Sequence, residues 1–265
     1  DDLGVEGLNV YGGEYYTPRL DGLARDGLRF ENAHATPLCT PTRVRMMTGR
    51  ENAKSYQAFG YLDPKARTFG HVLKEAGYRT AVVGKWQLSG NGYDGRIGAT
   101  PRQAGFDESF LWQEKSLDAK GSRYWGPTLS RNGQSRIHES GFGPELQTAF
   151  ALDFIERNRS GPFFLYYPIV LPHAPWVTTP DSPNARSDKD RFAGMVSYMD
   201  GQVGRVLDKL AELGLDKNTL VIFTSDNGTG RPITTYRNGV AVRGEKGLPT
   251  VSGTHVALLA RWPGR

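Results

Sequence analysis

The chain has 265 residues, enough to bury a substantial core, and an α/β fold of this length is commonly one domain, so we expect a single domain over residues 1–265. Hydrophobic residues make up 38% and charged residues 23%, as is typical of globular proteins, and the single cysteine excludes an internal disulfide. The net charge of +5 favours anionic ligands, but the lysines and arginines are scattered along the sequence, which argues against a nucleic-acid partner. The lack of a long apolar run argues against a membrane span.

Helical and strand-like hydrophobic patterns alternate along the chain. The expected elements, in chain order, are a helix over residues 17–30, a helix over 43–47, a helix over 68–76, a strand over 80–84, a helix over 145–159, a strand over 163–170, a helix over 191–213, a strand over 219–224 and a strand over 256–261. Pro18 suits the first turn of its helix, and Gly77 and Gly214 are typical helix ends.

This alternation predicts an α/β fold with a mostly parallel central sheet sandwiched by helices, because the strands are almost continuously apolar. Residues 89–140 are rich in glycine, asparagine and arginine, and we expect mainly loops there. In open α/β sheets, binding and catalytic groups gather at the carboxyl ends of the strands. Polar clusters follow several of the predicted strands, so we look for the site among them.

The two ends of the chain are abrupt. It opens on Asp1-Asp2-Leu3-Gly4, a sequence typical of the exit from a strand, with no strand before it. It closes on residues 260–265, directly after a predicted strand. We therefore expect both ends to be cut, with the first strand missing and any export signal outside the chain.

Acidic and amide side chains cluster at two predicted strand ends. Asp226 and Asn227 end the strand over 219–224, and Asp1 and Asp2 follow the presumed missing strand. Oxygen ligands of this kind suit calcium or magnesium. The alternative is that both segments are ordinary turns, because Asp and Asn favour turns for local reasons.

Cys39 is followed one helical turn later by Arg43. A single buried cysteine is often an inert small hydrophobic residue, and no Cys-His spacing accompanies it. The alternative is a nucleophile, because Arg43 would lie on the same side of a helix and the helix amino terminus carries a partial positive charge. The spacing alone leaves both interpretations open.

The segment Cys39-Thr40-Pro41-Thr42-Arg43, followed by Thr48-Gly49-Arg50, matches the Cys-x-Pro-x-Arg signature of the type I sulfatases in the alkaline phosphatase superfamily. Further segments fall in the order of that family, namely Thr17 to Asp21, Phe30 with Asn32-Ala33, Gly77 to Thr80, Gly84-Lys85-Trp86, Pro172-His173-Ala174-Pro175, Phe223 to Gly228, Gly244 to Gly247 and Trp262-Pro263-Gly264. The chain thus resembles these sulfatases over nearly its whole length, with residues 89–140 matching least. The resemblance implies the alkaline-phosphatase-like sulfatase fold, without its smaller carboxy-terminal subdomain.

In that family a maturation enzyme recognises the Cys-x-Pro-x-Arg context and oxidises the cysteine to formylglycine, which explains the residues that follow Cys39. The resemblance implies that one oxygen of the hydrated aldehyde attacks sulfur, and that the second hydroxyl lets the sulfated intermediate collapse and release sulfate. It also implies one bound calcium ion that helps ionise the nucleophile and neutralise the sulfate oxygens. The implied calcium ligands are Asp1, Asp2, Asp226, Asn227 and the modified Cys39.

The resemblance also assigns roles to the remaining polar residues of these segments. Arg43 would steady the nucleophile, and Lys85 and Lys246 would hold the sulfate oxygens. His173, with Lys246, would protonate the leaving oxygen. The alternatives are that the lysines are exposed loop residues and that His173 is a packed loop histidine.

Gln87 departs from the family pattern, because many members carry a histidine there that takes a proton as the intermediate collapses. Glutamine forms hydrogen bonds but cannot hold a proton near neutral pH. His255 and His34 are the candidate replacement bases, and otherwise Gln87 orients the diol with help from solvent or Lys85. A slow or inactive enzyme is a further alternative.

The resemblance implies hydrolysis of a sulfate ester, on a carbohydrate or another small molecule, in a periplasmic or secreted protein. Trp86, Trp112 and Trp125 are candidates for stacking on sugar rings, and otherwise belong to the core. Two alternatives stay open: a phosphonate monoester or phosphodiester hydrolase of the same superfamily, and an inactive relative that binds anions or glycans.

Overall fold

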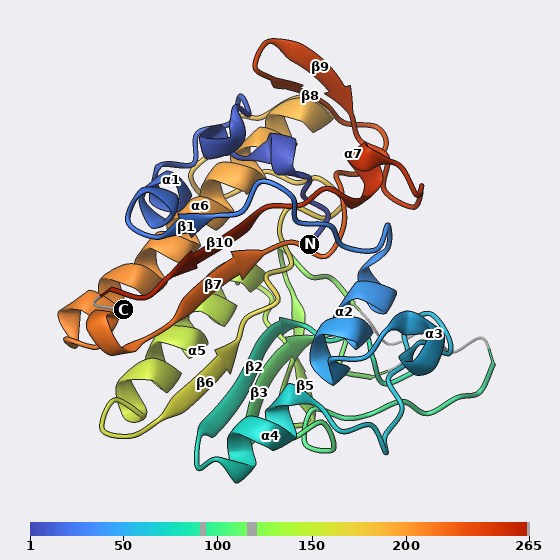
Figure 1. The fold of residues 1–265 in the computed structure, drawn as a ribbon, viewed down its shortest axis with the longest axis vertical. Coiled ribbons are helices and arrows are strands. Elements are labelled where there is room, and N and C mark those ends of the chain that lie inside the picture. The colour runs from blue at the N-terminus through green and yellow to red at the C-terminus, as the bar shows by residue number, and fades with distance from the viewer. Residues whose placement is uncertain (91–93, 116–120, 264–265) are drawn as a thin grey trace. The chain divides into compact units, whose positions relative to one another are not determined.

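The computed structural model describes residues 1–90, 94–115 and 121–263 (Figure 1). The chain forms two compact units. The first unit consists of Asp1–Thr42 and Leu171–Arg265, and the second of Arg43–Val170. Within the predicted Trp262-Pro263-Gly264 segment, Gly264 lies outside the described residues. The expectation of one domain over residues 1–265 stays a prediction.

Helix α2 (Cys39–Thr48) begins in the first unit and continues into the second. The other elements of the first unit are the 3₁₀ turns η1 (Val5–Gly7), η2 (Asn9–Tyr11) and η4 (Asp216–Asn218), the helices α1 (Pro18–Arg25), α6 (Asp188–Glu212) and α7 (Val251–Thr254), and the strands β1 (Leu28–Arg29), β7 (Val221–Thr224), β8 (Thr234–Arg237), β9 (Val240–Arg243) and β10 (Leu258–Arg261). The second unit contains α3 (Asn52–Ser55), α4 (Phe69–Glu75), α5 (Gly143–Arg157), β2 (Arg79–Lys85), β3 (Glu108–Trp112), β4 (Thr128–Arg131), β5 (Gln134–Ile137) and β6 (Phe163–Tyr166).

The second unit is built on a five-stranded sheet in the order β5-β4-β3-β2-β6. Strand β2 pairs in parallel with β3 and β6, whereas β3-β4 and β4-β5 are antiparallel. Phe110 of β3 stacks on Phe150 of α5, while its neighbour Leu111 joins a buried cluster with Val44 and Met47 of α2. Because successive side chains of a strand point to opposite faces, helices cover both faces of this sheet.

The first unit contains a three-stranded antiparallel sheet in the order β1-β10-β7 and a separate antiparallel hairpin, β8-β9. Helix α1 packs against α6 and β10. The loop after β7 carries Ser225 to Thr229, and most of these side chains are buried. This loop and the segment that begins at Asp1 therefore belong to the same unit.

The predicted α/β class is confirmed, and the described sheet is mixed, with parallel pairing centred on β2. The described part of residues 89–140 consists mainly of loops, as expected, but the strands β3, β4 and β5, which were not predicted, also lie there. Asn132-Gly133 joins β4 and β5 with φ of 51° and 89°, which is the two-residue hairpin turn that Asn-Gly favours. The predicted helix over 17–30 ends at Arg25, and β1 follows it.

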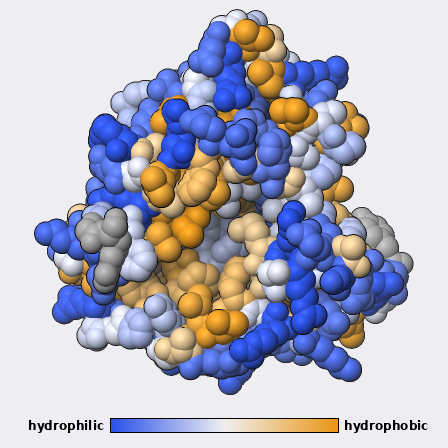
Figure 2. Space-filling view, in the orientation of Figure 1, coloured by the Kyte–Doolittle hydropathy of each residue, from blue (hydrophilic) through white to orange (hydrophobic). Residues whose placement is uncertain are grey.

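Hydrophilic residues cover most of the face in Figure 2, and hydrophobic residues form smaller patches between them. Trp86 and Trp112 are fully buried and belong to the core, which was the alternative to stacking on sugar rings, whereas Trp125 is 44% exposed. None of the helices in the described residues combines the length and apolar character needed to cross a bilayer.

Candidate functional site

The segment that begins at Asp1 is tied to the loop after β7 by backbone hydrogen bonds. Three successive backbone nitrogens donate to side chains of that loop, from Asp2 to Asp226 Oδ1 (3.1 Å), from Leu3 to Ser225 Oγ (3.3 Å) and from Gly4 to Thr229 Oγ1 (3.0 Å). Asp2 has a φ of 62°, a conformation that aspartate tolerates better than most residues. These bonds bring together two acidic segments that lie more than two hundred residues apart in sequence.

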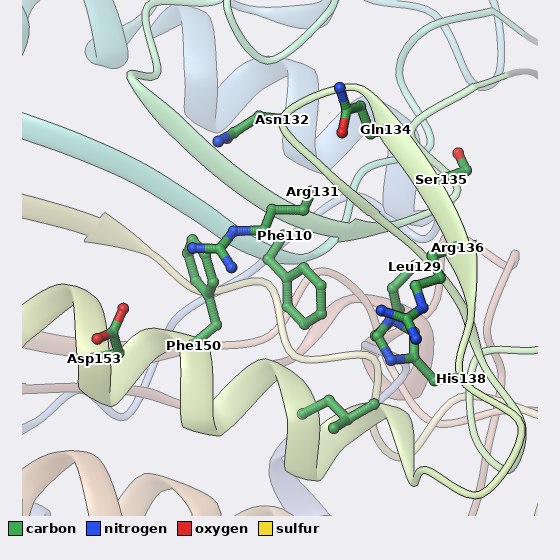
Figure 3. Close-up of a pocket in the computed structure, with 11 residues that line it drawn as sticks. Phe110, Leu129, Arg131, Asn132, Gln134, Ser135, Arg136, His138, Phe150 and Asp153 are labelled. Carbon is green, nitrogen blue, oxygen red and sulfur yellow. The ribbon is translucent and has the colours of Figure 1, made fainter.

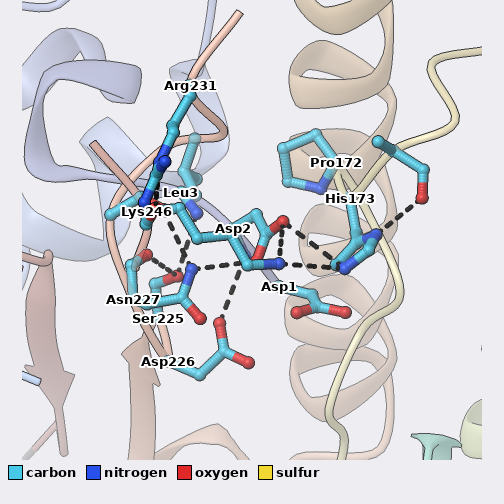
Figure 4. Close-up of polar contacts among 12 residues, drawn as sticks. Asp1, Asp2, Leu3, Pro172, His173, Ser225, Asp226, Asn227, Arg231 and Lys246 are labelled. Carbon is cyan, nitrogen blue, oxygen red and sulfur yellow. Dashed lines mark hydrogen bonds and ion pairs between the residues drawn. The ribbon is translucent and has the colours of Figure 1, made fainter. Parts of the chain in front are cut away.

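Ligand atoms of Asp1, Cys39 and Asp226 all lie within 4.8 Å of one another, and a second such group contains Asp1, Asp2 and His173. Asn227 Nδ2 donates to Asp2 Oδ1 at 2.8 Å (Figure 4). The other amide atom, Asn227 Oδ1, is buried without a hydrogen-bond partner. A buried carbonyl oxygen of this kind costs free energy unless something satisfies it.

These donors fit a hard divalent cation. Three carboxylates converge with ligand-like spacing, and the orphaned Asn227 oxygen is an acceptor that a cation would satisfy. Asp2, Cys39, Asp226 and Asn227 are buried, and Asp1 is half-buried. The sequence prediction of an oxygen-rich cluster beside Cys39 thus agrees with the arrangement in the first unit.

Lys246 and His173 lie against the same carboxylate (Figure 4). Lys246 Nζ contacts Asp2 Oδ2 at 2.6 Å and His173 Nε2 at 3.1 Å. His173 Nε2 is 3.5 Å from Asp2 Oδ2. Because His173 Nδ1 lies 2.6 Å from the carbonyl oxygen of Ala174, which can only accept, Nδ1 carries the hydrogen and donates. In the neutral form of this tautomer, Nε2 accepts from the Lys246 ammonium.

Cys39 is the first residue of α2 and is 2% exposed. The loop before it is fixed by a hydrogen bond from the backbone nitrogen of Gly247 to Pro37 O, at 2.8 Å. Thr36 and Thr42 join their hydroxyls at 2.6 Å across the start of the helix. Cys39 therefore lies at a helix amino terminus, where backbone N–H groups favour negative charge.

The second unit holds the other predicted catalytic residues, Arg43, Lys85 and Gln87. The Arg43 guanidinium donates to the carbonyl oxygens of Lys85, at 2.6 Å, and of Trp86. Arg43 and Lys85 are each 2% exposed. Gln87 has a φ of 52°, and its backbone nitrogen donates to Gln113 O at 2.9 Å. The roles of these three residues in the site stay predictions.

A comparison with known proteins assigns the family. The sulfatase family model matches residues 1–265. The chain belongs to the sulfatase family. This confirms the resemblance inferred from the motifs.

The chain is similar to several named proteins. Human N-acetylgalactosamine-6-sulfatase is 31% identical over 304 residues, which cover 100% of this chain and 56% of the human protein. Mouse steryl-sulfatase is 30% identical, with 99% of this chain and 56% of the mouse protein covered. The solved structure of Ps i-CgsB in complex with k-i-k-neocarrahexaose has a TM-score of 0.83 at 26% identity, and the match covers 100% of this chain and 64% of that chain. The chain thus spans about half the length of the curated relatives it matches.

The candidate bases His34 and His255 of this sulfatase-family chain stack on each other, with ring centroids 5.0 Å apart. His255 Nε2 donates to Glu31 O at 2.8 Å, and His34 Nδ1 lies 3.1 Å from Thr254 Oγ1. Neither belongs to the ligand-spaced groups around Asp1 in the described part of the chain. His71 completes the capping box of α4 with Thr68, which is a structural role.

A hollow of about 910 Å³ lies in the second unit between the β4-β5 hairpin and α5 (Figure 3). Its lining residues are Phe110, Leu129, Arg131, Asn132, Gln134, Ser135, Arg136, His138, Leu146, Phe150 and Asp153. Burial and the neighbouring Arg136 lower the pKa of His138. None of the predicted site residues lines this hollow, so it is separate from the predicted chemistry.

Sequence reasoning missed Glu6 and Thr229 of the sulfatase-family chain. Glu6 is 2% exposed, and Thr229 Oγ1 donates to Glu6 Oε1 at 2.6 Å while accepting from the backbone nitrogen of Gly4. Burial raises the pKa of Glu6. The only sequence signal was an acidic residue in an otherwise apolar segment close to Asp1 and Asp2, which is too weak to single it out.

Proposed function

We propose that this chain forms the catalytic region of a sulfuric ester hydrolase, with a formylglycine made from Cys39 as nucleophile and one calcium ion as cofactor. The observation that carries the proposal is the convergence of Asp1, Cys39 and Asp226, whose ligand atoms lie within 4.8 Å of one another. Membership of the sulfatase family supports the same reaction. These residues come from three segments that are distant in sequence. If the segments were only turns, nothing would require their side chains to meet.

Asp1, Asp2, Asp226 and Asn227 would hold the calcium ion, because carboxylate and amide oxygens are the ligands calcium prefers. When bound, calcium supplies Lewis-acid stabilisation of sulfate oxygens and of a deprotonated nucleophile. The protein's own contribution is to keep these groups dry and fixed. Asn227 is fully buried and Asp2 is 4% exposed.

Formylglycine at position 39, once hydrated, supplies a hydroxyl nucleophile. The first turn of α2 directs its backbone N–H groups toward that position, and we propose that they favour a negatively charged nucleophile. Arg43 and Lys85 would add positive charge. Arg43 is held by two carbonyl oxygens at the end of β2, so its guanidinium has few other orientations available.

Lys246 and His173 would supply the proton for the leaving alcohol. His173 donates through Nδ1 to Ala174 O and presents its Nε2 lone pair to Lys246 Nζ, at 3.1 Å. The exchangeable proton therefore resides on the Lys246 ammonium, which also contacts Asp2 Oδ2 at 2.6 Å. A leaving oxygen would take this proton from Lys246 directly, or from His173 after transfer to Nε2.

We propose a sulfated carbohydrate or a related small molecule as substrate. Support comes from the names of two similar proteins. One is an N-acetylgalactosamine-6-sulfatase, and the other, Ps i-CgsB, was solved in complex with k-i-k-neocarrahexaose. A formylglycine-generating enzyme would be the maturation partner, and a periplasmic or secreted location follows from the family by analogy. Gln87 leaves open which group takes the proton during sulfate release.

The test uses full-length protein produced with and without a formylglycine-generating enzyme. We expect mass spectrometry of the peptide containing Cys39 to detect formylglycine only with that enzyme, and sulfate release from an aryl sulfate to follow the modified fraction. Cys39→Ala should lower kcat by about 10⁴-fold or more. Faster turnover of an aryl phosphodiester would favour the phosphonate and phosphodiester hydrolases instead. An unmodified thiol together with sulfate binding and no turnover would favour an inactive anion-binding relative.

A further inference from the structure

Arg231 lies beside the proposed proton donor. Its Nε donates to the backbone carbonyl oxygen of Lys246 at 2.9 Å (Figure 4). The Arg231 side chain is exposed, whereas the Lys246 side chain is 20% exposed. The hydrogen bond therefore fixes an exposed guanidinium over the loop that carries Lys246.

The same guanidinium also lies close to the residues before Cys39. A Cβ built on Gly247 would be 3.2 Å from Arg231 Nη2 and 3.8 Å from Leu38 Cδ2. Gly247 has a φ of 88°, and its backbone nitrogen donates to Pro37 O at 2.8 Å. Since only the small Gly247 separates them, Arg231 lies at the edge of the loop that leads into Cys39.

Exposed arginines of this chain differ in whether a carboxylate pairs with them. Arg29 and Arg157, for example, each form an ion pair with a carboxylate, whereas Arg50 and Arg79 form none with the described residues. In the part of the chain that the structure describes, no carboxylate pairs with Arg231. Lys246, by contrast, is already bonded to Asp2. Among the described residues, Arg231 is thus one of the exposed arginines without a carboxylate partner, and its hydrogen bond to Lys246 O sets it apart from the others.

We propose that Arg231 binds a second anionic group of the substrate, a carboxylate or another sulfate, next to the ester that is cleaved. This inference rests on the proposed sulfatase function and narrows it to substrates with more than one negative charge. A guanidinium presents a planar fork of donors that matches either anion in a bidentate way. The Nε bond to Lys246 holds that fork in place before the substrate arrives, which lowers the entropic cost of binding.

The experiment compares three kinds of aryl sulfate as substrates of the full-length, formylglycine-bearing enzyme. They are 4-nitrophenyl sulfate, a sulfooxybenzoate tested as its meta and para isomers, and a benzenediol disulfate tested likewise. The measured quantity is the ratio of kcat/KM for each dianionic substrate to kcat/KM for 4-nitrophenyl sulfate. The variants are Arg231→Gln, Arg231→Lys and the control Arg25→Ala, which removes an exposed arginine on α1.

We expect Arg231→Gln to lower the ratio about tenfold for at least one dianion, because a charge-assisted hydrogen bond is lost. Arg231→Lys should lose less, since it keeps the charge, and Arg25→Ala should leave the ratio unchanged. The sulfooxybenzoates and disulfates distinguish a carboxylate ligand from a sulfate ligand.

An unchanged ratio in Arg231→Gln, with clear wild-type turnover, would overturn the role of Arg231 alone. A fall in kcat/KM that is equal for all substrates would also overturn it, because Arg231 would then act only by positioning Lys246. Absence of wild-type turnover on every sulfate, despite modified Cys39, would overturn the proposed function and this inference together.

Discussion

Glu6 is a buried acidic residue that follows Asp1 and Asp2 in the same segment. The hydroxyl hydrogen of Thr229 goes to Glu6 Oε1, so its oxygen is left to accept from Gly4 N. Glu6 therefore orients the hydroxyl that ties Gly4 to the loop after β7. Burial raises the pKa of Glu6, and this effect outweighs the lowering by the Thr229 hydrogen bond and by the charge of Arg237.

This pKa shift has a consequence for stability. A carboxyl group whose pKa is higher in the folded than in the unfolded protein stabilises the fold below the unfolded pKa, and that contribution is lost as the pH rises through the folded pKa. We therefore expect Glu6→Gln, which cannot ionise, to gain stability relative to the wild type as the pH rises above 4.5. Urea unfolding at a series of pH values measures this difference. A difference independent of pH would contradict the prediction.

The surroundings of Gly84 leave no room for a side chain. Its φ is 122°, and a Cβ there would lie 2.1 Å from Pro168 O. Gly239 also has a positive φ, 78°, but nothing lies within 4 Å of a Cβ built on it. We expect Gly84→Ala to cost about 3 kcal/mol or more, and Gly239→Ala about 1–2 kcal/mol from backbone strain alone. Equal losses of unfolding free energy in the two variants would argue against steric crowding at Gly84.

At the scale of single elements, α1 depends on α6 for its amino-terminal cap. The nitrogens of Arg19 and Leu20 donate to Asp200 Oδ2 and Oδ1, at 3.0 and 2.8 Å. Thr17 precedes the helix but makes no capping bond, and Pro18 has no N–H to satisfy. Asp200 thus satisfies two helix amides from another helix, and its burial raises its pKa.

Loss of this cap should be costly. We expect Asp200→Ala to lower the free energy of unfolding by about 2–4 kcal/mol, because one buried and one partly buried amide lose their acceptors. Asp208→Ala is the matched control, since Asp208 lies on the same helix and only pairs with Arg19 at the surface. We expect it to cost about 1 kcal/mol or less. Denaturant unfolding of both variants measures the difference, and similar losses would show that the cap contributes little.

At the scale of the whole molecule, the acidic cluster joins the two stretches of a unit that is discontinuous in sequence, Asp1–Thr42 and Leu171–Arg265. Three like charges held close together oppose the folded state unless a cation offsets them. Such an ion binds the folded protein only, so its binding free energy adds to stability.

We therefore expect calcium to stabilise the full-length protein. At a concentration about 100 times its Kd, calcium should add about 2.7 kcal/mol, which corresponds to a rise in Tm of roughly 5–10 °C. A chelator should reverse the rise. Asp226→Asn should reduce it, whereas the surface variant Asp208→Ala should not. A Tm that does not respond to calcium in the wild type would contradict calcium as the resident ion, and this readout does not depend on activity.

Most elements could be predicted from the sequence because their hydrophobic periodicity is strong. The strand β2 and the helices α5 and α6 are the best examples, and Pro18 does begin α1. The strands β5, β8 and β9 were missed because they are short and mostly exposed, so they carry little apolar alternation. The strands β3 and β4 are more buried, but they are short and lie in a segment rich in glycine, asparagine and arginine. Two Asn-Gly pairs, Asn132-Gly133 and Asn238-Gly239, were the available signals for these hairpins.

The sequence by itself determined the alternation of helices and strands, the motif around Cys39 and the residue types that could hold a cation, because periodicity and short motifs are local properties of a chain. The meeting of Asp1 and Asp226 beside Cys39 agrees with what the family motifs implied. Only the tertiary structure decided that His34 stacks on His255, that Thr229 donates to Glu6, and that Arg231 reaches the edge of the site. Contacts between residues this far apart depend on how strands pair and how loops pack, and no local pattern encodes them.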